Sequence, residues 1–147
     1  MATPTGHAAT RSEFQELAAQ KLREAKALLD AGHFHGAYYL SGYAVEFGLK
    51  ACICRRRMRQ GNFPDKEFSR AVYTHDLETL VALADLKSKR DQWTTKQPQF
   101  GQRWAAVARW TEHTRYQLAV TETEAKTIVV AITAPKLGVL TWLKKYW

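Results

Sequence analysis

A long helical pattern between Gly36 and Arg57, GAYYLSGYAVEFGLKACICRRR, sets the strongest constraint on the fold of this chain. Its small and apolar residues recur at steps of three and four, which is typical of an α-helix. A helix that is apolar on most of its sides is usually central in its domain. Each glycine within it costs roughly 1 kcal/mol of helix stability, so close packing against another helix is expected. We predict a helix over residues 35–58.

Further segments carry apolar residues at helical spacing on either side of this central helix. A helix over 12–31 opens with a capping box at Ser12, whose partner glutamine lies three residues on. A short helix over 75–87 follows Thr74, which can cap it. A longer helix is predicted over 99–116.

The last predicted helix opens at a second capping box, Thr121–Glu124, and a kink is expected at Pro135, because proline removes a helical hydrogen bond. The basic segment KSKRDQWTTKQPQFGQ is expected to be a loop. Five helices without a convincing strand predict an all-α fold, an up-and-down bundle. A chain of 147 residues suits one domain, placed at 12–147 after a flexible tail, 1–11.

The formal net charge is +8, which permits binding to nucleic acid, to a phosphate-rich ligand or to an acidic partner. The densest basic cluster, CRRRMR, lies at the end of the central helix and contains Arg55, Arg56 and Arg57. These arginines are candidate phosphate contacts. Alternatively, the negative end of the helix dipole favours positive charge at this position.

Cys52 and Cys54 are two residues apart, so on a helix they point about 200° away from each other and cannot form a disulfide. Without a second pair of ligands they give no metal site, and Cys52 is expected to be a small core residue. The N-terminus lacks the pattern of a signal peptide, and no apolar run approaches the roughly 18 residues of a membrane span. A soluble, cytoplasmic protein without a cofactor is expected.

Glu46 places a carboxylate in the middle of the central helix, between Val45 and Phe47. A buried carboxylate needs a partner, because an unpaired charge in the core is costly. The first interpretation is a structural pair with an arginine or a hydroxyl group. The alternatives are a role in orienting a ligand-binding arginine, and an exposed pair with Lys50 at the i,i+4 spacing.

The segment ARWTEHTRY gathers groups that suit phosphate chemistry on the predicted helix 99–116. Arg109 and His113 are four residues apart and would share a face, with Arg115 and Tyr116 close by. An arginine, a histidine and a tyrosine in such an arrangement can hold a phosphate and move a proton. The alternative is a solvated polar face.

Four segments in order resemble the bacterial HEPN domain over about residues 13–147: LLDAGHFHGAYYLSGYAVEFGLKA, THDLETL, RWTEHTRY and GVLTWLKKYW. The most specific of them is AYYLSGYAVEFGLKA, in the central helix. The resemblance implies a bundle of about five helices that usually forms a homodimer. It also implies that Glu46 neutralises a buried arginine, for which Arg115 is the candidate.

Many HEPN domains are ribonucleases that cut RNA without a metal, often as toxins in toxin–antitoxin or defence modules. Active members carry an arginine and a histidine with about four to six residues between them, usually on the penultimate helix, and these groups pair across the dimer. Here Arg109 and His113 have only three residues between them. Arg70 and His75 in RAVYTH match the spacing but precede the third predicted helix.

Three functions are consistent with these residues. The first is a HEPN module that binds RNA or nucleotide, or accompanies a nucleotidyltransferase or an antitoxin, and the irregular spacing of Arg109 and His113 favours it. The second is a metal-independent endoribonuclease that uses Arg109 and His113, or Arg70 and His75. The third is a purely structural helical dimer.

Overall fold

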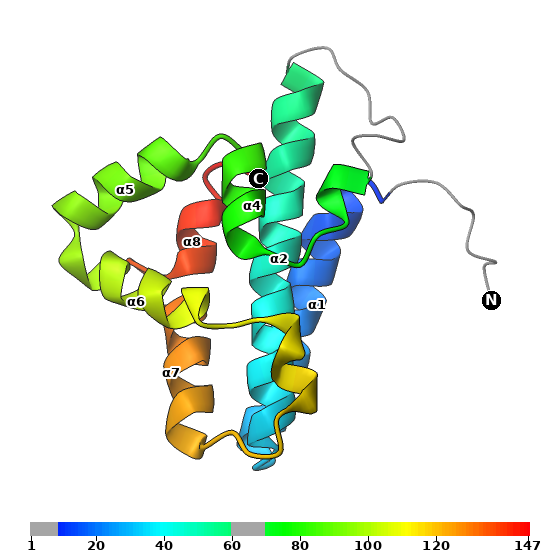
Figure 1. Ribbon diagram of the computed structural model, residues 1–147, viewed down its shortest axis with the longest axis vertical. Coiled ribbons are helices and arrows are strands. Elements are labelled where there is room, and N and C mark those ends of the chain that lie inside the picture. The colour runs from blue at the N-terminus through cyan, green and yellow to red at the C-terminus, as the bar shows by residue number, and fades with distance from the viewer. Residues whose placement is uncertain (1–8, 60–69) are drawn as a thin grey trace.

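The computed structural model of this chain describes residues 9–59 and 70–147. Within these ranges the fold is all-α and contains no β-strand, as predicted. The elements in chain order are α1 (Arg11–Asp30), α2 (Phe34–Arg59), α4 (Leu77–Leu83), α5 (Lys87–Lys96), α6 (Pro98–Ala108), the 3-10 helix η1 (Glu112–Tyr116), α7 (Glu122–Thr133) and α8 (Val139–Leu143) (Figure 1). Among the described residues, no helix has the combination of length and apolar character needed to cross a membrane.

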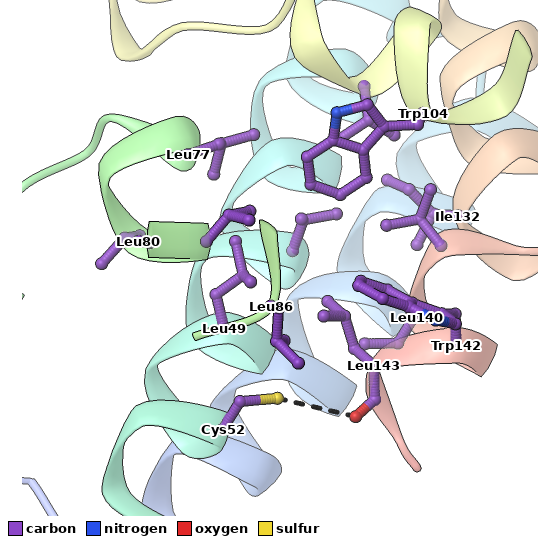
Figure 2. Close-up of a cluster of buried hydrophobic side chains, with 14 of the residues drawn as sticks. Leu49, Cys52, Leu77, Leu80, Leu86, Trp104, Ile132, Leu140, Trp142 and Leu143 are labelled. Carbon is purple, nitrogen blue, oxygen red and sulfur yellow. Dashed lines mark hydrogen bonds between the residues drawn. The ribbon is translucent and has the colours of Figure 1, made fainter. Parts of the chain in front are cut away.

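Helix α2 is the centre of the molecule, which the apolar character of its sequence predicts. It runs along the long axis in Figure 1 and packs against α1, α4, α7, α8 and η1. Figure 2 shows how Leu49 and Cys52 of α2 lie in the same cluster as leucines of α4 and α8 and as Trp104 of α6. Leu49 and Ile132 of α7 are fully buried in this cluster. Helices from both halves of the sequence therefore share one core.

Two glycines of α2 allow the close packing that the sequence indicates. A Cβ atom on Gly42 would lie 1.9 Å from ring atoms of Trp110, so the indole of Trp110 sits directly on the helix backbone. Gly48 gives similar space to α8, where a Cβ atom would lie 3.1 Å from Leu140 and 3.3 Å from Leu143. These approaches offset the cost of glycine within a helix.

Local capping differs from the sequence prediction at two helices. Helix α1 is capped by Thr10 and Glu13 in a full capping box, rather than by Ser12. Helix α4 begins at Leu77 because the Asp76 carboxylate accepts hydrogen bonds from two backbone N–H groups of the first turn. The predicted tail is mostly outside the described residues, since residues 1–8 are not described.

The segment predicted as a basic loop forms helix α5, which lacks an apolar stripe. Its anchor is Arg90, which is 7% exposed. The guanidinium of Arg90 donates hydrogen bonds to the carboxylates of Glu78 and Asp91 and lies 5.1 Å from the ring centroid of Trp104. A buried charged side chain therefore anchors this helix, whereas helices are normally anchored by the apolar residues that a sequence pattern reveals.

The described residues form eight helices instead of the predicted five, because two long predicted helices are divided and a predicted loop forms α5. Helix α6 ends at Ala108, and the rest of the predicted helix 99–116 is an extended link followed by η1. At the second division, Ala134 has ψ 131°, the extended conformation that a following proline favours. Pro135 therefore separates α7 from α8 instead of kinking one helix.

Candidate functional site

The carboxylate of Glu46 lies in the core and has two partners. Glu46 is 1% exposed; its Oε2 accepts a hydrogen bond from Nζ of Lys50 at 3.0 Å, and its Oε1 lies 2.8 Å from Nδ1 of His75. Lys50 is itself buried, at 5% exposure. The predicted arginine, Arg115, is not one of these partners, and its guanidinium lies instead against the ring of Tyr116. The pair with Lys50 has the expected spacing but is buried rather than exposed.

His75 connects this buried pair to the surface. It directly precedes the capping Asp76, and its side chain is 42% exposed. Its ring packs edge-on to Tyr43 with centroids 5.8 Å apart. Because Nδ1 faces the carboxylate, the second ring nitrogen, Nε2, is left for proton exchange with a ligand. A histidine oriented by a carboxylate in this way is suited to act as a general acid or base.

A cavity of about 320 Å³ brings His75 and His113 together between the start of α4 and the link from α6 to η1. The two histidines belong to different Arg–His pairs in the sequence. Trp110 forms part of the wall. The carboxylates of the lining residues make the cavity acidic; they are Asp76, Glu78 and Glu112.

The predicted common face of Arg109 and His113 does not form. Arg109 caps the end of α6, and Thr111 is extended, so the two side chains lie on different elements. The cause is Trp110, which turns into the core and donates its indole N–H to the backbone carbonyl of Tyr39 at 3.1 Å. His113 lies on η1 with 74% of its side chain exposed.

An aromatic column follows α2 beside this cavity. His35, Tyr39, Tyr43 and Phe47 recur every four residues, and each ring lies within 6.4 Å of the next. The hydroxyls of Tyr39 and Tyr43 are 3.2 Å apart and form a hydrogen bond. Burial is the main cause that raises the pKa of Tyr43, and this hydrogen bond is the second. Nε2 of His35 lies 2.7 Å from the carbonyl oxygen of Thr114, which attaches η1 to the column.

Arg115 and Tyr116 extend from η1 next to the aromatic column. The guanidinium of Arg115 lies 4.8 Å from the ring centroid of Tyr116, which is 71% exposed. The hydroxyl groups of Tyr116 and, to a smaller extent, Tyr39 raise the pKa of Arg115. The exposed Arg115 and Tyr116 and the half-buried Tyr39 and Tyr43 form a surface that we call the arginine–tyrosine face (Tyr39, Tyr43, Arg115, Tyr116).

The other predicted site residues lie apart from the cavity that holds His75. Arg70 is exposed and is not part of its lining. Arg55 and Arg56 line a different cavity at the C-terminal end of α2, and Arg57 is half-buried on the same turns. The structure thus separates the arginine cluster from the histidines.

The sequence interpretation missed two parts of this site. The repeat of aromatic residues every four positions in α2 was a signal that could have revealed the column. The pairing of Glu46 with His75 had no local signal, since 29 positions separate them.

Among the described residues, no group of three or more His, Cys, Asp or Glu side chains could hold a metal ion. In comparisons with family models, curated proteins and solved structures, nothing matched this chain.

Proposed function

We propose that this protein is a HEPN-type module that binds single-stranded RNA or a nucleotide on the arginine–tyrosine face. The observation that carries the proposal is the position of Arg115 next to the exposed ring of Tyr116, on a 3-10 helix that packs against α2. A guanidinium can hold a phosphate with two parallel hydrogen bonds, and tyrosine rings can stack on unpaired bases. The net charge of +8 would add a general attraction for a polyanion.

The binding test compares two variants by fluorescence anisotropy with a labelled single-stranded RNA. Replacing Arg115 and Tyr116 by alanine should weaken binding by about tenfold or more, because stacking alone contributes about 1–3 kcal/mol per base. Arg23→Ala, which removes an exposed arginine on α1, is the matched control and should weaken binding less than about threefold. Equal losses in both variants, or no binding by the wild type, would contradict the proposal.

A second candidate function, metal-independent RNA cleavage, is favoured by the pairing of His75 with Glu46. In this reaction Nε2 of His75 takes the proton of an RNA 2′-hydroxyl group, and the 2′-oxygen attacks the adjacent phosphorus. The bond from phosphorus to the 5′-oxygen breaks, and His113 donates a proton to that oxygen. The products are a 2′,3′-cyclic phosphate and a free 5′-hydroxyl. The carboxylates around the cavity repel a polyanion. We therefore rank RNA cleavage at this cavity below binding on the arginine–tyrosine face.

Cleavage is tested with labelled RNA in the presence of EDTA. His75→Ala should reduce the rate by about 100-fold or more, in the range of a lost general base, and His113→Ala should also slow it. His33→Ala replaces an exposed histidine at the start of α2 and should leave the rate unchanged. No cleavage by a folded wild type would exclude the reaction and leave RNA binding as the function. The homodimer and the nucleotidyltransferase or antitoxin partner stay predictions.

A further inference from the structure

A second cavity, again of about 320 Å³, lies at the C-terminal end of α2 and is lined by residues from the end of α4, the start of α5 and the end of the chain. Figure 1 shows where these elements lie in the fold. Four basic residues line it, Arg55, Arg56, Lys89 and Lys145; Nζ of Lys145 lies 4.9 Å from the ring centroid of Trp93, which is not a lining residue. Asp85 is the one carboxylate among its lining residues. The dipole of α2 accounts for arginines in its last turns, but Lys89 and Lys145 come from other elements. The positive charge is therefore concentrated on a cavity and not only on a helix end.

Hydrogen bonds to the backbone hold both arginines in place. Nη1 of Arg55 donates to the carbonyl oxygen of Lys145 at 3.1 Å, and Nη1 of Arg56 donates to that of Leu83 at 3.3 Å. Asp85 is a weak competitor for these charges, because its carboxylate is 3.7 Å from Nη2 of Arg56 and 76% exposed. Fixed guanidinium groups lose less conformational entropy when they bind an anion.

The remaining walls are apolar or aromatic. Nζ of Lys89 lies 4.9 Å from the ring centroid of Tyr146, which keeps this cation at the cavity. Cys52 contributes to the lining, and burial raises the pKa of its thiol to about 12, so the sulfur is neutral and unreactive. The cavity thus offers non-covalent binding through its cations.

We propose that this cavity binds a diphosphate group, either free or carried by a nucleotide. Arg55, Arg56 and Lys89, with Lys145 beside them in the chain fold, match the charge of two linked phosphates better than that of a single phosphate. The volume lies at the small end of the range for ligand pockets, about 300–1,000 Å³. The site is separate from the arginine–tyrosine face and does not depend on RNA binding there.

Isothermal titration calorimetry with inorganic pyrophosphate tests the proposal directly. Wild-type protein should bind, and the double variant Lys89→Glu, Lys145→Glu should bind at least about tenfold more weakly, because two attractive charges become repulsive. The control is Lys87→Glu, Lys96→Glu, which makes the same charge change at exposed positions of α5 outside the cavity. This control should weaken binding less than about threefold. Thermal melting checks that each variant is folded.

Two further arms identify the source of the phosphates and separate this site from the other face. If ADP displaces pyrophosphate, the ligand of this site is a nucleotide. If ADP does not displace it, the ligand is the free anion, and either result supports the site. Adenosine, which lacks phosphate, should not bind. Replacing Arg115 and Tyr116 by alanine should leave pyrophosphate binding intact. The proposal is overturned by absent binding at about 1 mM pyrophosphate, or by equal losses in the cavity and control variants.

Discussion

Oε1 of Glu46 lies 2.8 Å from Nδ1 of His75, so a residue in the middle of the central helix fixes a side chain at the start of α4. The same carboxylate accepts a hydrogen bond from Lys50, which supplies a buried opposite charge. His75 also lines a cavity that is open to solvent, so it connects this buried cluster to the surface. The stability of the core and the geometry of the candidate site therefore depend on one carboxylate.

Glu46→Gln should destabilise the fold strongly. The substitution keeps the shape of the side chain but leaves Lys50 as a buried charge without its counter-ion. Removing one partner of a buried ion pair typically costs about 3–5 kcal/mol. Urea unfolding followed by circular dichroism measures the loss in the free energy of unfolding.

The double variant Glu46→Gln, Lys50→Met is the control for this explanation. Replacing both charges by neutral groups of similar volume is often neutral, so most of the lost stability should return. A double variant as unstable as Glu46→Gln alone would mean that the ion pair is not the cause. The contact with His75 would then carry the effect.

Gly42→Ala should destabilise the protein through Trp110. The added Cβ atom would lie 1.9 Å from the indole ring, and a rigid ring cannot move aside as a flexible side chain can. Overpacking of this kind typically costs about 1–3 kcal/mol. The displaced indole should also change the tryptophan fluorescence, and the cavity that Trp110 helps to form should widen.

Gly36→Ala is the matched control on the same helix. There the new Cβ atom would lie 3.0 Å from Cδ1 of Leu28, the end of a flexible side chain that can shift. Alanine favours a helix over glycine by about 1 kcal/mol, so this variant should be close to wild type in stability or above it. Equal destabilisation by both substitutions would exclude the packing of Trp110 as the reason.

The buried thiol of Cys52 should make stability fall at alkaline pH. Burial raises the pKa of Cys52 to about 12, whereas a thiol in an unfolded chain titrates near pH 8.5. The folded state holds this proton more tightly, so the contribution to stability is complete below about pH 8.5 and is lost as the pH rises towards 12. Between about pH 8 and 10, the free energy of unfolding should fall less steeply with pH in Cys52→Ala than in wild type.

The reactivity of the thiol gives an independent measurement. In a Cys54→Ala background, Cys52 is the single cysteine of the chain. Ellman's reagent should then react slowly with folded protein and rapidly in urea, because the reactive species is the thiolate. Rapid reaction of the folded variant would contradict the burial of Cys52.

Local patterns in the sequence were sufficient for the all-α fold, for the central position of α2 and for the burial of Glu46. They failed where tertiary contacts override periodicity. The buried guanidinium of Arg90 anchors α5 without an apolar stripe, and Trp110 leaves the helical path to pack on Gly42. The partner of Glu46 could not be predicted, because His75 becomes its neighbour only when α4 docks on α2.

Asp76→Ala should affect both stability and the orientation of His75. Oδ1 of Asp76 accepts hydrogen bonds from the N–H groups of Glu78 and Thr79 at 3.0 and 3.2 Å, and losing a cap typically costs about 1 kcal/mol. The cap also fixes the chain immediately after His75. In NMR spectra, the Nδ1 proton of His75 should exchange with water faster in this variant than in wild type.

Thr121→Ala removes the cap of α7 and should cost a similar amount of stability, without a change at His75. Asp76→Asn retains a good capping residue and should restore both stability and the slow exchange of the histidine proton. If the proton stays protected in Asp76→Ala, the hydrogen bond to Glu46 holds the imidazole by itself. Faster exchange confined to Asp76→Ala would instead show that the start of α4 positions His75 at the cavity.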